Sequence, residues 1–208
     1  MAMKLRDRIV VTLMLGFSYA SCLAQENNSS FRNGYVAVAI GPAIPVGEFG
    51  NSEIGNRSAG FAKTGLTFSA INVGYRFKYV ELTALLIGSA FFLSQNAADK
   101  DAVWIYRGAF IGSVIPRDIS KKVQVGAKAM LGYLNTTSPE ITVAGTTIPE
   151  QSGADLAIIG GINVRYNVFD RWCAIVDVYY LASEPKFDNY QQKIRTVNVA
   201  FGVGFRLK

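Results

Sequence analysis

The chain has 208 residues, a formal net charge of +6 and no histidine, and half of its residues are hydrophobic. This length fits a single domain. The lack of histidine excludes a Ser-His-Asp triad, a histidine general base and an imidazole metal ligand. Lysines and arginines are scattered singly rather than clustered in a stripe, which argues against a nucleic-acid partner.

Residues 1–24 have the pattern of an export signal. Basic residues open the segment, an apolar stretch follows at 9–17, and small residues stand at the cleavage-determining positions before Gln25. The apolar stretch is far below the roughly 20 residues that a membrane-spanning helix needs. We therefore interpret residues 1–24 as a removed signal peptide and 25–208 as one mature domain. Lipidation at Cys22 is the less favoured alternative, because the preceding residues match a lipoprotein signal poorly.

The rest of the chain alternates apolar residues with small or polar ones in eight segments. A two-residue period places alternate side chains on opposite faces of a strand. The predicted strands are Gly34–Ile44, Gly65–Phe77, Tyr79–Phe91, Val103–Ile115, Lys122–Leu134, Ala154–Val168, Trp172–Ala182 and Arg195–Leu207. Each reaches the roughly 9 to 11 residues that a tilted strand needs to cross a bilayer.

The connections between these strands alternate in length. Short ones lie at 77–79, 116–121 and 169–171, and long polar ones lie at Val46–Thr64, Phe92–Ala102, Asn135–Gly153 and Ser183–Ile194. Small outer-membrane barrels have short periplasmic turns and longer extracellular loops. The pattern predicts an all-β protein, an eight-stranded antiparallel up-and-down transmembrane barrel, with both termini in the periplasm.

The volume of the side chains indicates which strand face points inward. An eight-stranded barrel has an interior just wide enough to be filled by side chains or to hold one small ligand. One face of most strands carries bulky apolar residues and the other carries Gly, Ala, Ser and Asn. We expect the bulky face to point outward, which is tolerable only in lipid. A periplasmic or secreted ligand-binding barrel, with its apolar face inward, is the alternative.

Three strands need separate treatment. In the fourth, we expect Trp104, Tyr106, Phe110 and Val114 to face outward, opposite Arg107. The second and third strands alternate less regularly. In the second strand, apolar Phe68 shares a face with polar Asn72. In the third, Leu85 and Ile87 share a face with Glu81.

Aromatic residues gather near the predicted strand ends. Two aromatic girdles at the level of the lipid headgroups are typical of membrane barrels. The predicted periplasmic girdle is Tyr75, Phe77, Tyr79, Tyr166, Phe169, Trp172 and Phe205, and the predicted outer girdle is Phe91, Trp104, Tyr106, Tyr133 and Tyr180.

This assignment of faces places charged side chains of both signs in the lumen. The predicted lumen residues are Glu81, Arg107, Lys128, Asp155, Arg165, Asp177 and Arg206. Unpaired charges are costly in a narrow, largely dry interior, so we expect a structural network of salt bridges and hydrogen bonds. A catalytic or ion-pathway role for Glu81 or Asp177 is the alternative. Without Cys22, Cys173 is the only cysteine, so no intrachain disulfide is expected.

Several glycine-aromatic motifs resemble those of small outer-membrane β-barrel domain proteins, including PorT-like ones. They are Gly34–Pro42 followed by Pro45–Phe49, Gly74–Phe77 and Gly202–Phe205. The resemblance implies an eight-stranded barrel similar to those of OmpA and OmpX, and that family has no common catalytic residues. The chain departs from the family at its end, where Lys208 stands in place of an aromatic residue.

These features predict an integral protein of the bacterial outer membrane with no wide pore, no enzymatic activity, no cofactor and no catalytic or metal-binding residues. Its expected partners are outer-membrane lipid, the barrel-assembly machinery, and a protein or surface ligand at the extracellular loops. The loops Val46–Thr64 and Asn135–Gly153 are the longest, which favours a structural or adhesive role through them. A PorT-like accessory role in secretion or envelope assembly is the alternative.

Overall fold

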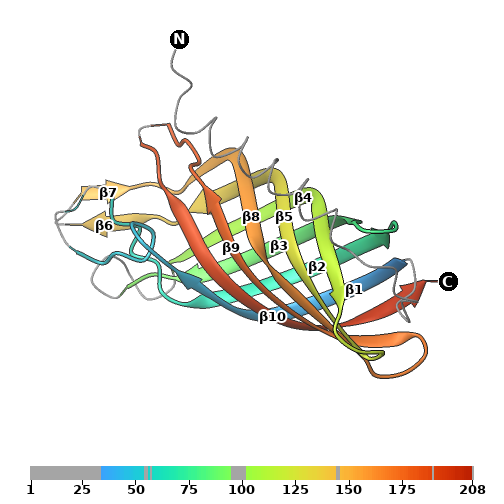
Figure 1. Ribbon diagram of the computed structural model, residues 1–208. Helices are drawn as coiled ribbons and strands as arrows, with labels where there is room; N and C mark the ends of the chain where they lie inside the picture. Colours follow the sequence, from blue (N-terminus) through green and yellow to red (C-terminus); the bar gives the residue numbers. More distant parts are fainter. Residues whose placement is uncertain are drawn as a thin grey trace, which may run out of the picture.

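Eight antiparallel strands form a closed barrel in the computed structural model (Figure 1), which confirms the predicted fold class. The structure describes residues 34–53, 56, 58–94, 102–143, 146–188 and 190–207, so the predicted signal peptide lies outside the described residues. The barrel strands are β1 Gly34–Pro45, β2 Gly65–Arg76, β3 Glu81–Phe92, β4 Val103–Asp118, β5 Val123–Ser138, β8 Gln151–Asn167, β9 Trp172–Ser183 and β10 Ile194–Leu207. They are ordered β1-β10-β9-β8-β5-β4-β3-β2 around the barrel. None of the described residues forms a helix that is long and apolar enough to cross a membrane.

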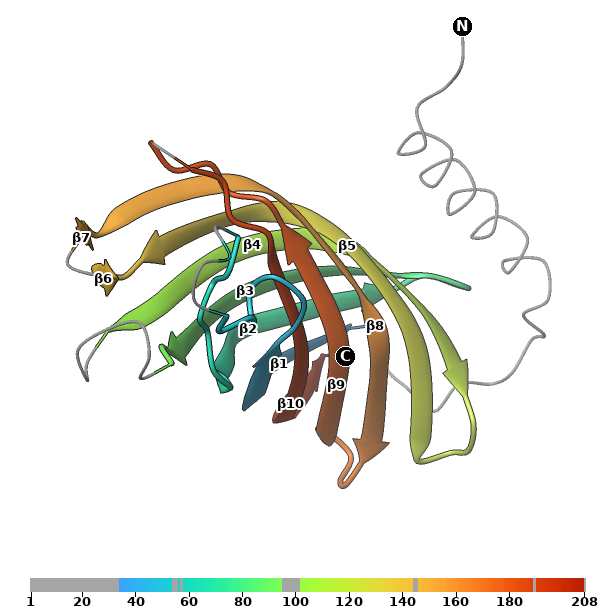
Figure 2. The same ribbon diagram turned by 90° about the vertical axis from the view of Figure 1, so that its left-hand side faces the viewer.

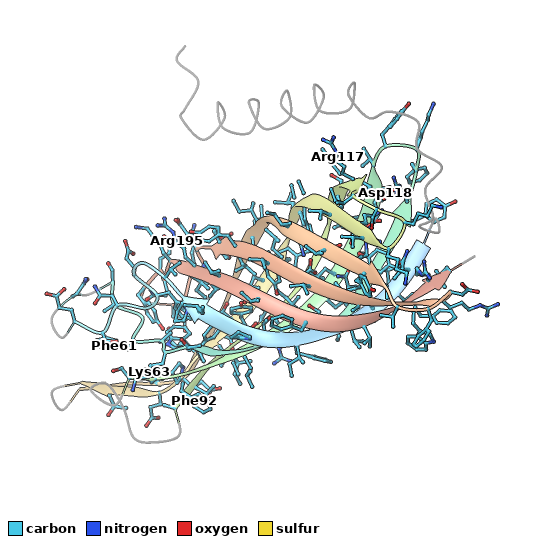
Figure 3. The ribbon with its side chains drawn as sticks, turned by 60° about the horizontal axis from the view of Figure 1, so that its bottom comes forward. Phe61, Lys63, Phe92, Arg117, Asp118 and Arg195 are labelled. Carbon is cyan, nitrogen blue, oxygen red and sulfur yellow. The ribbon has the colours of Figure 1, made fainter. Side chains whose placement is uncertain are left out.

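The two ends of the barrel differ in their connections. The turn end carries the short connections 77–80, 119–122 and 168–171, and the loop end carries the long connections. Arg117 and Asp118 lie at the turn end in Figure 3, and Phe61 and Arg195 lie at the loop end. Barrels of this class place short turns in the periplasm, so the loop end faces outward from the cell in that orientation.

The connection between β5 and β8 contains a small hairpin that the sequence pattern did not predict. Strands β6 Ile141–Val143 and β7 Thr146–Ile148 form a separate two-stranded sheet. The barrel strands below it are longer than predicted, because β5 and β8 pair as far as Ser138 and Gln151. Figure 2 shows the hairpin projecting beyond the loop end of the barrel.

The outer surface of the barrel is apolar on every strand. Exposed large apolar side chains include Ile40, Leu66, Leu82, Ile111, Leu131, Ile158, Val178 and Phe201, one from each barrel strand in chain order. So continuous an apolar band is far larger than the patches that water-soluble monomers expose. Because all backbone groups of a closed barrel pair between strands, this surface suits the interior of a bilayer.

At the turn end the exposed aromatic residues form the predicted girdle. Tyr75, Phe77, Tyr166, Phe169 and Trp172 are all exposed on the outer surface. Tyr75 and Phe77 are in edge contact, with ring centres 5.1 Å apart, and Trp172 is 5.3 Å from the ring of Phe205. This half of the girdle prediction agrees with the structure.

At the loop end the girdle prediction is largely wrong. Tyr133 and Tyr180 are exposed as expected, whereas Phe91, Trp104 and Tyr106 are buried. These three rings belong to the interior of the barrel, so they cannot contact lipid headgroups.

The orientation predicted for β4 is inverted. Trp104, Tyr106, Phe110 and Val114 point inward, and Arg107 is exposed on the outer face. The lumen has room for these large residues because small residues stand beside them. A Cβ atom on Gly132 would lie 2.5 Å from Cδ1 of Phe110, so the missing side chain on β5 makes the space for the ring on β4.

A β-bulge explains the irregular pattern of β2. The register between β2 and β3 shifts between Ser69 and Ile71, which places an extra residue in β2. A bulge changes the phase of the two-residue alternation. Phe68 is therefore exposed outside while Asn72 is buried inside, although their spacing in sequence puts them on one face of a regular strand.

Candidate functional site

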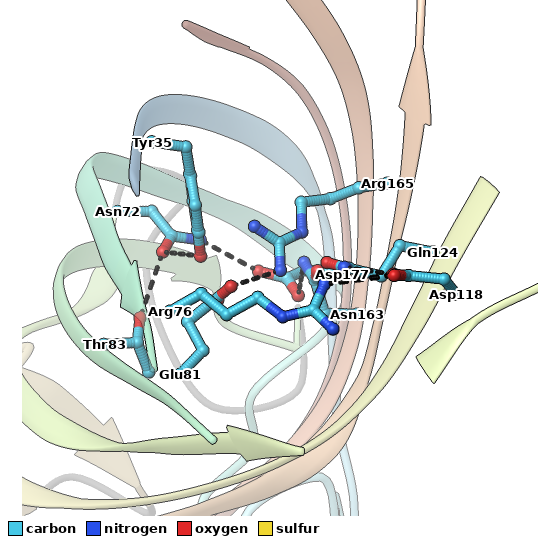
Figure 4. Close-up of polar contacts among 10 residues, drawn as sticks. All are labelled: Tyr35, Asn72, Arg76, Glu81, Thr83, Asp118, Gln124, Asn163, Arg165 and Asp177. Carbon is cyan, nitrogen blue, oxygen red and sulfur yellow. Dashed lines mark hydrogen bonds and ion pairs between the residues drawn. The ribbon is translucent and has the colours of Figure 1, made fainter. Parts of the chain in front are cut away.

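The turn-end half of the lumen contains a buried polar network that joins strands across the barrel (Figure 4). The carboxylate of Glu81 on β3 pairs with the guanidinium of Arg165 on β8. The same guanidinium lies over the ring of Tyr35, 4.4 Å from its centre. A Cβ atom on Gly74 would lie 2.8 Å from Oε1 of Glu81. This ion pair therefore depends on a glycine at that position in β2.

A second ion pair lies beside the first. Nζ of Lys128 is 3.0 Å from Oδ2 of Asp177, and it also lies 4.6 Å from the ring centre of Tyr179. The side-chain amides of Asn163 and Asn72 donate to the Asp177 carboxylate at 2.8 and 3.3 Å. Asp177 thus receives contacts from three other strands, which makes it the centre of the network.

The network continues toward the turn end through Asp118. Gln124 donates to this carboxylate at 2.6 Å, and Arg76 pairs with it at 3.1 Å. Arg206 donates to the backbone carbonyl of Phe169 in the turn between β8 and β9. These contacts tie the ends of β2, β4 and β5 to one another and the end of β10 to the β8–β9 turn.

The structure brings together most, but not all, of the charges predicted for the lumen. Glu81, Lys128, Arg165, Asp177 and Arg206 are buried inside, and the first four form the two central ion pairs. Asp155 shares the inward register of β8 but lies near the loop end and is only partly buried. Arg107 is a wrong assignment, because β4 has the opposite orientation and places this side chain outside beside Asn135.

Above the network, the middle of the lumen holds a layer of hydroxyl and amide groups. Ser89 donates to the Thr67 hydroxyl at 2.9 Å, and that hydroxyl is 3.2 Å from the Tyr179 hydroxyl. The Tyr106 hydroxyl is 3.2 Å from the Thr196 hydroxyl and donates to Asn198 at 3.4 Å.

The loop-end half of the lumen is filled by an apolar core. Its buried side chains include Leu85, Phe91, Trp104, Tyr106, Phe110, Leu134 and Leu181. Phe91 packs on Tyr106 with ring centres 5.4 Å apart. Contacts of this kind resemble the core of a water-soluble protein, and they leave the exposed outer band to meet lipid.

Two loops close the mouth of the barrel with inserted aromatic rings. Phe49 of the β1–β2 loop is fully buried between Phe91 and Trp104, with ring centres 5.2 and 5.6 Å away. Phe187 of the β9–β10 loop packs on Trp104 at 6.0 Å. The indole nitrogen of Trp104 donates to the backbone carbonyl of Gly60 at 2.9 Å. We call Phe49, Phe61 and Phe187, which all belong to one buried cluster, the aromatic plug.

The backbone of the β1–β2 loop is shaped to hold this plug. Phe61 has a φ angle of 52°, which is uncommon for a residue other than glycine and costs of the order of 1 to 3 kcal/mol. Its amide donates to the carbonyl of Asn51 at 2.9 Å, and its carbonyl accepts from the amide of Ser94 at 2.8 Å. Burial of its ring and these hydrogen bonds offset the strain.

The sequence pattern does not predict the aromatic plug, because the composition of the long loops is that of polar binding surfaces. The usable signal was the occurrence of single aromatic residues within otherwise polar loops. Phe49 follows Gly47-Glu48, Phe61 follows Ala59-Gly60, and Phe187 follows Pro185-Lys186. A large apolar residue in a long loop between two strands has only the barrel mouth or the membrane in which to bury its surface.

The filled lumen gives a prediction for ion flow. Protein reconstituted in a planar bilayer is expected to show little or no steady conductance, because the network, the hydroxyl layer and the aromatic plug occupy successive levels of the lumen. The measurement is single-channel current of purified monomer. Large, stable currents would contradict this description of the lumen.

The buried carboxylates of the lumen were the candidates for a catalytic role. Among the described residues, no group of three or more His, Cys, Asp or Glu side chains is placed to hold a metal ion. The buried carboxylates of Glu81 and Asp177 each pair with a buried cation, Arg165 and Lys128 respectively. The geometry favours the structural interpretation of these two residues over the catalytic one.

The fold is shared with solved outer-membrane proteins. A Neisserial surface protein A structure matches with a TM-score of 0.57 and 14% identity, over 84% of this chain and 97% of that one. The outer membrane protein OprG from Pseudomonas aeruginosa matches with a TM-score of 0.54 and 12% identity, over 86% of this chain and 99% of that one. No family model matches the sequence, and no curated protein matches it. The chain therefore has the fold of the small eight-stranded outer-membrane barrels.

Proposed function

We propose that this protein is a closed scaffold in the bacterial outer membrane, which presents the outer surface of its loops to a protein or surface ligand. The observation that carries the proposal is the aromatic plug, because it turns two of the long loops into part of a rigid core. A lumen filled in this way supports recognition at the surface rather than passage through the barrel. The similarity to a protein named for its surface location also supports it.

The described loops divide into two kinds. The β1–β2 and β9–β10 loops send side chains into the barrel, through Phe49, Phe61 and Phe187. The β5–β8 connection, residues 139–150, instead forms the β6–β7 hairpin beyond the barrel. Binding surfaces on rigid scaffolds are commonly carried by such projecting connections. We therefore place the recognition surface on this hairpin.

Replacement of residues 139–150 by a short glycine-serine turn is expected to abolish binding of cells to their surface ligand and leave the barrel folded. The reason is that Ser138 and Gln151 already pair at the top of β5 and β8, so a short turn can join them. The measurement is cell attachment to a panel of host or surface polymers, with a heat-modifiable gel band as the control for folding.

The same variant separates the adhesive role from a PorT-like accessory role in secretion. Unchanged attachment, together with a secretion defect in cells that lack the whole protein, would favour the accessory role. Deletion of the β1–β2 loop is unsuitable for this comparison, since it would also remove Phe49 and Phe61 from the apolar core.

A further inference from the structure

The turn end of the barrel carries an excess of exposed positive charge. Lys78, Lys121, Lys122 and Arg171 are exposed and come from the three short connections, and Arg117 is exposed at the adjoining end of β4. Asp170 is the one exposed carboxylate that the described turns carry beside them. We call these five basic residues the basic rim.

The loop end does not share this excess. Its described, exposed charges are of both signs, with Glu53, Glu184 and Asp188 alongside Lys63 and Lys186. The positive charge is therefore concentrated at one end of the barrel axis, where it can meet an anionic partner. Figure 3 shows Arg117 at this end, opposite Lys63 and Arg195.

The basic rim lies directly beside the turn-end aromatic girdle. Lys78 stands between Phe77 and Tyr79, and its ammonium group lies 5.1 Å from the ring centre of Tyr79. Arg171 precedes the exposed Trp172. Aromatic girdles mark the level of the lipid headgroups. The girdle therefore places the cations where headgroup phosphates lie.

The turns also carry exposed apolar side chains among these cations. Ile119 is 62% exposed in the β4–β5 turn, and Phe169 is 70% exposed in the β8–β9 turn. Bulky apolar side chains next to lysine and arginine suit the boundary between headgroups and acyl chains. They do not suit a rim that is surrounded by water alone.

We propose that the basic rim binds the anionic headgroups of phospholipids in the leaflet that meets the turn end. The five cations are spread around the barrel, over three turns and the end of β4, so a single small anion cannot contact them all. A ring of lipids around the barrel contacts every turn at once. Clustered Lys and Arg next to an anionic membrane surface bind it electrostatically, and salt weakens that binding.

The two tryptophans of the chain provide the measurement. Trp172 is 51% exposed at the turn end, whereas Trp104 is 2% exposed inside the lumen. Lipids with brominated acyl chains quench tryptophans that they touch, so Trp172 reports the local lipid and Trp104 gives a constant background. Vesicles that mix phosphatidylglycerol and phosphatidylcholine, with either lipid brominated, then give the relative affinity of the two lipids at the rim.

The wild-type protein is expected to prefer phosphatidylglycerol by a factor on the order of five at low salt. The triple variant Arg117→Gln, Lys122→Gln, Arg171→Gln is expected to bring that ratio close to one. The matched control is Lys63→Gln, Lys186→Gln, Arg195→Gln, which removes the same charge from the loop end and should leave the ratio unchanged. Heat-modifiable mobility checks that each variant is folded.

Three results would overturn the proposal. One is a wild-type protein with equal affinity for phosphatidylglycerol and phosphatidylcholine at the rim. This holds also if the protein sediments with peptidoglycan instead. Another is a rim variant that keeps the full preference. The third is a loop-end control that loses as much preference as the rim variant, since the effect would then follow net charge rather than position.

Discussion

Replacing Asp177 with alanine is expected to lower the free energy of unfolding by about 3 to 5 kcal/mol. The change leaves Lys128 buried in the lumen without its carboxylate, and it removes the acceptor for the amides of Asn72 and Asn163. The side chains of Lys128 and Asp177 are 3% and 1% exposed, so water cannot take the place of the lost partner. Urea unfolding in detergent micelles or vesicles measures the loss.

The double variant Lys128→Met, Asp177→Leu is the control for this prediction. It removes both charges and fills a similar volume with apolar atoms, so it should recover most of the lost stability. If the single variant unfolds at the same urea concentration as the wild type, the ion pair does not stabilise the lumen.

The second large effect concerns the outer face. Leu131→Arg is expected to destabilise the folded protein in lipid by about 2 to 4 kcal/mol, the cost of a basic side chain near the bilayer midplane. Leu131 is exposed in the middle of β5, level with Ile111 on β4 and Ile158 on β8, which are also exposed. The measurement is equilibrium unfolding from phospholipid vesicles.

Asn135→Arg is the matched comparison on the same face of the same strand. Asn135 is exposed nearer the loop end and pairs with Arg107. The outer face therefore already carries a charged side chain at that level. The same substitution there should cost only about 0 to 1 kcal/mol. Equal costs at the two positions would argue against a lipid-facing band around Leu131.

The inward and outward faces of the regular strands could be predicted from sequence, because the alternation of bulky apolar residues with small or polar ones determines them. In β5, β8 and β10, bulky apolar residues such as Leu131 and Ile158 mostly alternate with small or polar ones, and the structure exposes the bulky set. The ion pairs of Glu81 with Arg165 and of Lys128 with Asp177 lie on the inward faces that this reasoning assigned. The pairing of each carboxylate with its cation could not be predicted, because it depends on the register of strands that lie far apart in the sequence.

The errors arise where one strand is apolar on both faces. In β4, Ile105 and Ile111 face outward while Tyr106 and Phe110 face inward, so the pattern carries little information and the single charge of Arg107 misled the assignment. Whether a ring fits inside depends on glycines of the neighbouring strands, such as Gly132. Such a fit is a property of the packed barrel and not of one strand.

The seam between β1 and β10 has a consequence for how the chain reaches its folded state. These strands pair from Gly34 with Leu207 to Pro45 with Thr196, so the first and last described strands close the barrel. Most other neighbours are hairpins, which form quickly, whereas pairing between distant segments is slow. Until β10 is in place, β1 presents an unpaired edge that invites association with other chains. We therefore expect a factor outside the polypeptide to protect this edge from aggregation before the barrel closes.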